Sequence, residues 1–127
     1  MTQQPKALLV DDNALNSRLA ATLLRRLGWL PQMADDGLHA LALLAAERFD
    51  LVLLDLRMPL LGGEEVCRRI REDLRLRELP VIAYTAHGMP EEQARIVAAG
   101  FNGLLLKPTS FHDMRLLCQQ YAPSASL

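Results

Sequence analysis

The chain has 127 residues, a formal net charge of -1 at pH 7 and a pI near 6.3. This length fits one domain that buries roughly two-thirds of its unfolded surface, and the charge gives no general attraction to nucleic acid or anionic membranes. The first six residues lack a signal-peptide core and no apolar run approaches the ~20 residues of a membrane helix, which predicts a cytoplasmic protein without membrane insertion. Any electrostatic function must therefore be local.

Apolar runs and helical patterns alternate five times along the chain. The first strand is predicted over 6–10, and the helix over 14–28 stops at Gly28, which suits the left-handed conformation at a helix end. The weaker strand over 29–34 contains Pro31, which belongs near a sheet edge. The first helix is expected to bury Leu19, Ala20, Leu23, Leu24 and Leu27, and the second Leu38, Leu41, Ala42 and Ala45.

The second half of the chain continues the alternation. The third strand is predicted over 50–54, and the fourth starts at Pro80. Pro90 in a first helical turn begins the fourth helix, and Gly100 and Gly103 bracket the way into the fifth strand. The third helix is expected to bury Val66, Cys67 and Ile70, and the last helix Phe111, Met114, Leu117, Cys118 and Tyr121.

These elements predict one domain over 1–127 with a core of about 6–121, because no repeat, linker or second composition zone occurs. Right-handed crossovers with helices on both faces give an α/β fold, a flavodoxin-like doubly wound (βα)5 sheet in the strand order 2-1-3-4-5. The charged stretch 68–78 interleaves acids with arginines and has no aromatics. It is therefore interpreted as a solvated face and loop rather than a direct nucleic-acid contact.

Reactive side chains follow four of the predicted strands. Asp11 and Asp12 follow the first apolar run, and Asp55, Thr85 and Lys107 follow the third, fourth and fifth. Each alone has a plain structural explanation as a helix cap, a turn residue or a solvent-exposed lysine. In an open α/β sheet, however, ligands bind at the carboxyl ends of the strands. We therefore expect these residues to converge on one site.

Charge balance sets the chemistry of that site. Three converging carboxylates, Asp11, Asp12 and Asp55, would repel by a few kcal/mol per close pair at an effective dielectric of ~20. Lys107 supplies one positive charge and a hard divalent cation the rest, because Mg²⁺ takes carboxylates, carbonyls and waters. The three aspartates are the predicted ligands, directly or through water, and the backbone carbonyl of Arg57 is placed to complete the shell.

A site of this kind is suited to phosphoryl transfer, which needs a nucleophile, a metal to neutralise oxygens and donors for the remaining positions. Asp55, at the end of the most central strand, is the best nucleophile. The Thr85 hydroxyl and the Lys107 ammonium are expected to hold the phosphoryl oxygens.

The chain resembles the response-regulator receiver domains of two-component phosphorelays along essentially its full length. The motifs that carry this resemblance are Leu9-Val10-Asp11-Asp12-Asn13, Leu53-Leu54-Asp55-Leu56-Arg57-Met58-Pro59 with Gly63, Ala83-Tyr84-Thr85-Ala86, Ala98-Ala99-Gly100 and Leu106-Lys107-Pro108.

The resemblance implies a phosphoprotein rather than an enzyme, one that catalyses only its own phosphorylation and dephosphorylation. Asp55 would accept phosphate from a phosphohistidine of a histidine kinase or histidine phosphotransfer protein, with Mg²⁺ required. Thr85 and Lys107 would couple the acyl phosphate to the face of the fourth helix, fifth strand and fifth helix, which contacts a downstream protein target. A monomer or a weak phosphorylation-dependent dimer is expected. If Met1 is the native start, a stand-alone receiver is expected. If the domain was excised from a longer protein, it is expected to be the receiver of a hybrid kinase.

Four residues are assigned to switching or partner contact. Many receivers carry an aromatic three positions before the lysine, but this chain has Leu104 there, so the usual aromatic toggle cannot operate. We expect Thr85 to reposition the 86–90 loop, which contains His87, instead. Leu15 is either an ordinary flanking residue or the apolar contact for a donor helix bundle, and Pro108 lies beside the lysine. By resemblance, Arg57 and His87 tune the acyl-phosphate lifetime.

Three other classes of protein share parts of this pattern. A small Mg-dependent phosphatase of the haloacid-dehalogenase type needs a second Asp two residues after the nucleophile, where this chain has Arg57. A flavodoxin-like cofactor-binding module uses a hydroxyl-rich phosphate loop, whereas Asp11 and Asp12 would repel a phosphate without metal. A pure interaction module would not need the complete reactive set. Nucleotide-binding glycine motifs do not occur.

Overall fold

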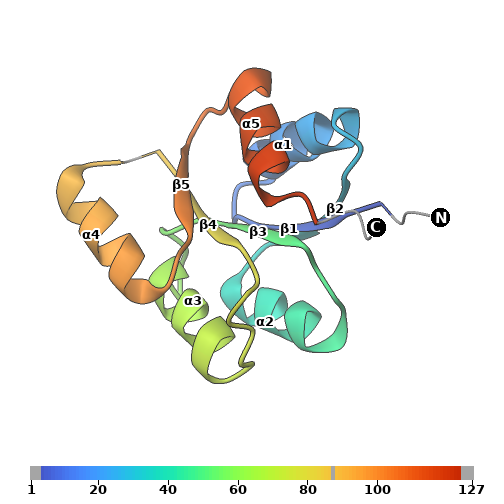
Figure 1. Cartoon of the computed structure of the whole chain (residues 1–127). Coiled ribbons are helices and arrows are strands. Elements are labelled where there is room, and N and C mark those ends of the chain that lie inside the picture. The colour runs from blue at the N-terminus through green and yellow to red at the C-terminus, as the bar shows by residue number, and fades with distance from the viewer. Residues whose placement is uncertain (1–3, 87, 124–127) are drawn as a thin grey trace.

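The computed structural model describes residues 4–86 and 88–123. Five strands and five helices alternate along the chain (Figure 1). The strands are β1 (Lys6–Val10), β2 (Leu30–Ala34), β3 (Leu51–Leu54), β4 (Val81–Thr85) and β5 (Gly103–Leu106). The helices are α1 (Ala14–Arg26), α2 (Gly37–Ala46), α3 (Gly63–Glu72), α4 (Pro90–Ala99) and α5 (Phe111–Tyr121).

All strands pair in parallel in the order β2-β1-β3-β4-β5, so the predicted flavodoxin-like topology is confirmed, with β2 at an edge. Helices α1 and α5 cover one face of the sheet, and α2, α3 and α4 cover the other (Figure 1). The middle strands β3 and β4 are buried at every position and therefore consist mostly of apolar residues, with Thr85 at the end of β4 as a polar member. No described helix is long and apolar enough to cross a membrane.

The inward faces of three helices differ from the prediction. Ala42 and Ala45 in α2 are exposed, and Phe111 in α5 is 36% exposed, although all three were expected to face inward. Leu19 in α1 is 53% exposed and Leu38 in α2 is 59% exposed, whereas both were expected in the core. In α2 the buried side consists of small residues, Gly37 and Ala40, together with Leu44. A Cβ on Gly37 would lie 2.5 Å from Val66 Cγ2, so this helix approaches α3 too closely for a larger side chain. Close packing against α3 therefore selects a face with few large apolar residues.

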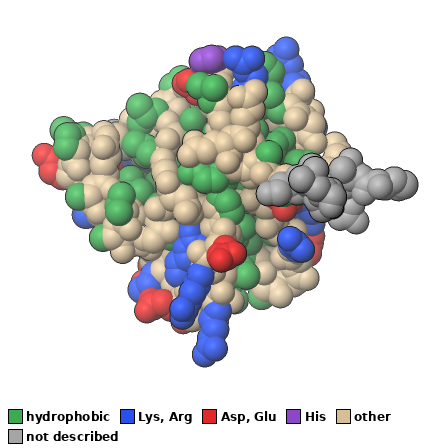
Figure 2. Space-filling view, viewed as in Figure 1, with side chains coloured by type: hydrophobic (Ala, Val, Ile, Leu, Met, Phe, Trp, Pro, Cys, Tyr) green, Lys and Arg blue, Asp and Glu red, His purple; other side chains and the backbone are tan. Residues whose placement is uncertain are grey.

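The charged stretch 68–78 lies mainly on the surface, and Figure 2 shows acidic and basic side chains intermingled near α3. Within this stretch Ile70 is buried and Arg71 is half-buried. Its guanidinium donates hydrogen bonds to the carbonyls of Leu76, Leu79 and Gly100 at 2.6–3.1 Å and to Asn102 Oδ1 at 2.7 Å. Arg71 thus joins the loop after α3 to the C-terminal end of α4.

Candidate functional site

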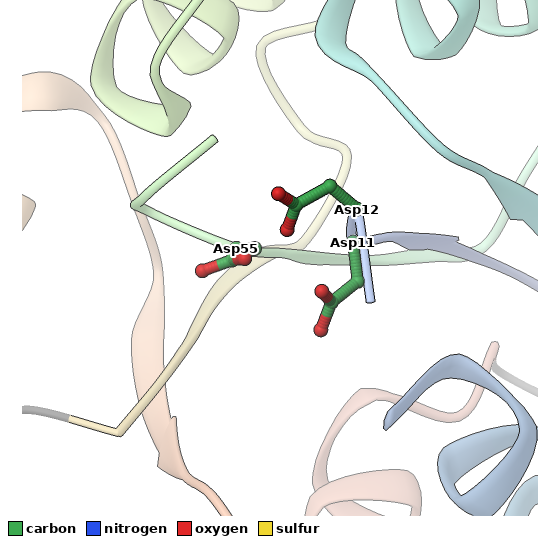
Figure 3. A group of neighbouring side chains, drawn as sticks. All are labelled: Asp11, Asp12 and Asp55. Carbon is green, nitrogen blue, oxygen red and sulfur yellow. The ribbon is translucent and has the colours of Figure 1, made fainter. Parts of the chain in front are cut away.

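Strand pairing places the acidic residues side by side at one edge of the sheet. Val10 of β1 is paired with Leu54 of β3, so Asp11 and Asp55 are the next residues on adjacent strands. The Asp55 N–H donates to the Val10 carbonyl at 2.9 Å, which extends the ladder to the aspartates. Figure 3 shows the side chains of Asp11, Asp12 and Asp55 gathered there, and ligand oxygens from all three lie within 4.8 Å of one another.

Local backbone hydrogen bonds orient two of the carboxylates. The Asn13 N–H donates to Asp11 Oδ1 at 2.8 Å, and the Arg57 N–H donates to Asp55 Oδ1 at 3.1 Å. Such Asx turns hold a carboxylate over the residues that follow it. Gly63 allows α3 to start against the Asp55 loop, because a Cβ there would collide with the Asp55 carbonyl oxygen. The turn and the start of the helix therefore fix the direction of Asp55.

The site is partly removed from solvent, which makes its negative charge costly. Asp11 is 3% and Asp55 is 6% exposed, whereas Asp12 is exposed. Burial raises the pKa of Asp55, and the charges of Asp11 and Asp12 add to that effect. The Arg57 amide and the Lys107 ammonium oppose it, but the net pKa stays above its usual value. Additional positive charge would therefore be bound favourably.

Lys107 and Thr85 reach the same edge from β5 and β4. The Lys107 ammonium donates to Asp11 Oδ2 at 2.6 Å and lies 3.5 Å from Asp55 Oδ2. The Lys107 N–H donates to the Thr85 carbonyl at 2.8 Å, and Thr85 is 1% exposed. The residues predicted from four separate strand ends are thus brought together.

The three aspartates fit a magnesium ion. Every donor in the group is a carboxylate oxygen, and Mg²⁺ is a hard cation that prefers oxygen ligands and retains several waters. The exposed Asp12 leaves one side accessible to water and to a phosphodonor. Asp11, Asp12 and Asp55 would hold the ion.

The predicted partner and switch residues surround the site at different depths. Leu15, in the first turn of α1, is 64% exposed. Leu104 is half-buried against the core on the side of α2, α3 and α4, and Pro108 is exposed. His87 lies outside the described residues.

Two residues near the site were not selected from the sequence. The Tyr84 ring centroid lies 4.9 Å from the Lys107 ammonium, and Glu92 Oε1 lies 3.8 Å from the Arg57 guanidinium. Strand alternation could have indicated Tyr84, since it precedes Thr85 and shares a face with Leu105. Glu92, an acid in the first turn of α4, is 8% exposed.

This fold and acidic edge define a phosphoacceptor domain, and comparison with known proteins agrees. The family model described as "Response regulator receiver domain" matches residues 7–119. The chain is 42% identical over 112 residues to the sensor histidine kinase AruS of Pseudomonas aeruginosa, covering 87% of this chain and 11% of AruS. It is 39% identical over 109 residues to the chemotaxis protein CheY-3 of Vibrio cholerae, covering 85% of this chain and 84% of CheY-3.

Solved structures show the same similarity. The receiver domain of the sensor histidine kinase PA1611 from Pseudomonas aeruginosa PAO1, with a magnesium ion coordinated in its active-site cleft, superposes with a TM-score of 0.85 at 31% identity. That match covers 94% of this chain and 98% of the other. Vibrio cholerae CheY4 superposes with a TM-score of 0.88 at 28% identity, covering 94% of this chain and 99% of CheY4.

The chain belongs to the response regulator receiver domain family. It is a phosphoacceptor signalling module rather than a classical enzyme, and its Asp11, Asp12 and Asp55 site serves Mg-dependent phosphorylation in phosphorelay signalling. Receiver domains interact with histidine kinases. The phosphoacceptor interpretation is thereby selected over the phosphatase and the cofactor-binding module.

Proposed function

We propose that Asp55 is the residue phosphorylated, by a phosphohistidine of a histidine kinase or histidine phosphotransfer protein. The observation that carries this assignment is its position beside Asp11 on the strand next to β1, with the Lys107 ammonium 3.5 Å from its carboxylate. An Asp55 carboxylate oxygen attacks phosphorus, the phosphorus–nitrogen bond breaks, and the donor imidazole keeps the electron pair and takes up a proton.

The surrounding residues prepare Asp55 for this step. When bound, Mg²⁺ neutralises the charge of the phosphoryl oxygens. Asp11, Asp12 and Asp55 would hold the ion, and the backbone carbonyl of Arg57 is the proposed fourth protein ligand. The Lys107 ammonium, 3.5 Å from Asp55 Oδ2, and the Thr85 hydroxyl donate to the transferred group.

Phosphorylation of Asp55 is tested by incubating the protein with acetyl phosphate and Mg²⁺ and measuring its intact mass. Wild type should gain the mass of one phosphoryl group, and Asp55→Asn should not. An adduct that persists in Asp55→Asn, or no adduct in wild type with either acetyl phosphate or a phosphorylated histidine phosphotransfer protein, would overturn the assignment.

Donor docking is proposed at Leu15, because an apolar side chain 64% exposed beside an acidic site suits the apolar surface of a helix bundle. Leu15→Asp should slow transfer from a phosphorylated phosphotransfer protein and leave labelling by acetyl phosphate unchanged. Equal transfer by the variant and wild type would remove this role from Leu15.

The output is proposed to pass through the loop after Thr85, since an aliphatic Leu104 replaces the usual aromatic. Movement of Thr85 would reposition residues 86–90, and a downstream protein would bind the face of α4, β5, Pro108 and α5. The receiver itself would be a monomer or a weak phosphorylation-dependent dimer. The domain is proposed to act in the cytoplasm. Amide NMR shifts of residues 86–106 that do not change on phosphorylation would contradict this route.

A further inference from the structure

The route of the Lys107 side chain follows from the strand order. Lys107 comes directly after β5, but its ammonium contacts Asp55 after β3 and Asp11 after β1. Because β4 lies between β5 and β3, the side chain must pass above the end of β4. A side chain near that end of β4, on the face that the lysine crosses, therefore determines where the lysine lies.

Tyr84 occupies that place on the same face of the sheet. It pairs with Leu105, and both belong to the core cluster beneath α1 and α5. Lys107 is two residues beyond Leu105, so the alternation of a strand directs it to the same side, and its N–H bond to the Thr85 carbonyl continues the ladder. The ammonium accordingly lies over the Tyr84 ring, 4.9 Å from its centroid.

The contact between the Lys107 ammonium and the Tyr84 ring is well shielded from solvent. Tyr84 is 4% exposed, and the Lys107 side chain is 12% exposed, so the cation and the ring meet with little water around them. A cation is attracted to the face of an aromatic ring, and the attraction is stronger when both partners are desolvated. An aliphatic side chain at this position would pack in the core but would not attract the ammonium.

We propose that Tyr84 is a positioning residue for phosphoryl transfer, whose ring holds the Lys107 ammonium at the acidic edge. The proposal rests on the proposed function of Asp55 and Lys107 and adds a residue that touches neither phosphate nor metal. The ring face is the group that acts, so phenylalanine can replace tyrosine and leucine cannot.

The test compares Tyr84→Leu with Tyr84→Phe in the full chain. Phosphorylation by acetyl phosphate and Mg²⁺ should be about fivefold slower in Tyr84→Leu and within about twofold of wild type in Tyr84→Phe. Urea denaturation confirms that both variants are folded at the assay temperature. Equal rates in Tyr84→Leu and wild type, or equal slowing by both substitutions, would overturn the proposal.

A second measurement reports the geometry without metal or donor. Lys6 and Lys107 are the only lysines of the sequence, so ¹³C-lysine labelling gives two side-chain signals. Lys6 lies 4.7 Å from the Phe49 ring and serves as an internal reference. The ε-methylene protons of Lys107 should lose their upfield ring shift in Tyr84→Leu but keep it in Tyr84→Phe, while Lys6 stays unchanged.

The two measurements separate this proposal from the assignment of Asp55. A Lys107 signal unaffected by Tyr84→Leu contradicts the role of Tyr84, whatever the protein does with acetyl phosphate. Failure of wild type to form an adduct with any donor contradicts the proposed phosphorylation of Asp55, and the lysine signals still decide whether the ring holds the ammonium.

Discussion

Lys107 forms its shortest contact with Asp11 at 2.6 Å and lies 3.5 Å from Asp55. Lys107 therefore pairs most closely with Asp11, whose strand β1 is further from β5 than the other strands of the site. The negative charge of Asp55 is only partly neutralised by the Lys107 ammonium. This division leaves Asp55 open to a second cation and to an incoming phosphoryl group. In the absence of metal, the Lys107 ammonium stabilises the folded protein by pairing with these buried carboxylates.

Replacing Lys107 by methionine should destabilise the metal-free protein by about 3 kcal/mol, because it leaves buried carboxylates without their partner. Lys6→Met is the matched control. The Lys6 pair with Glu47 is similarly short at 2.7 Å, but its side chains are 28% and 39% exposed, so we expect a much smaller loss. Urea denaturation in EDTA measures both variants, and equal losses would contradict the difference in burial.

Asp55→Asn should stabilise the metal-free protein by about 1 kcal/mol at pH 7, since it removes one of three repelling carboxylates. Burial raises the pKa of Asp55 in the folded state, so stability of wild type falls as pH rises above the usual value of 3.8. The advantage of the variant should therefore disappear at lower pH. Asp35→Asn, at a side chain 83% exposed, is the control and should show no such pH dependence.

With Mg²⁺ present, wild type should become more stable than Asp55→Asn. Binding to the folded state alone stabilises a protein in proportion to RT ln(1 + [L]/Kd), so Mg²⁺ should raise the unfolding free energy of wild type and raise that of Asp55→Asn much less. Denaturation with and without Mg²⁺ measures both effects. Equal stabilisation of both proteins would show that Asp55 is not a ligand.

Much of the site follows from the sequence because strand ends are local signals. An apolar run followed by an acid places Asp11 and Asp55 at one edge as soon as the topology is parallel. Which face of each helix is buried was less predictable. Leu38 faces solvent because the small Gly37 and Ala40 allow α2 to approach the sheet and α3, and that choice depends on the packed partner.

The contacts of individual side chains were the least predictable feature. Both Asp11 and Asp55 were possible partners for Lys107, and only the three-dimensional path over Tyr84 shows that Asp11 is closer. Glu92 lies in the first turn of α4, and its side chain extends to Arg57. Both relationships join residues from different strand ends or loops, so no periodicity within one segment reports them.

The two cysteines should be unreactive in the folded protein. Burial raises the pKa of Cys67 and of Cys118 to about 11, so both remain thiols at neutral pH. Labelling with a disulfide reagent at pH 8 should require unfolding by urea. Because the folded pKa is raised, stability should also fall as pH rises from 9 towards 11. Rapid labelling without denaturant would contradict the burial of both residues.

Arg57 should slow hydrolysis of the phosphorylated aspartate. Its side chain is 66% exposed beside Asp55 and is held 3.8 Å from Glu92, where it can restrict the approach of water. Arg57→Ala should shorten the lifetime of the phosphoprotein about threefold, equivalent to roughly 0.7 kcal/mol of barrier. Glu92→Gln should act in the same direction but less, because the guanidinium remains without its anchor.

Phosphate release after removal of acetyl phosphate measures these lifetimes. Arg95→Ala is the control, since this exposed arginine pairs with Glu64 at 3.8 Å between α3 and α4. Its lifetime should match wild type. If Arg57→Ala also matches wild type, the guanidinium does not restrict water. If Glu92→Gln shortens the lifetime in an Arg57→Ala background as much as in wild type, Glu92 does not act through Arg57.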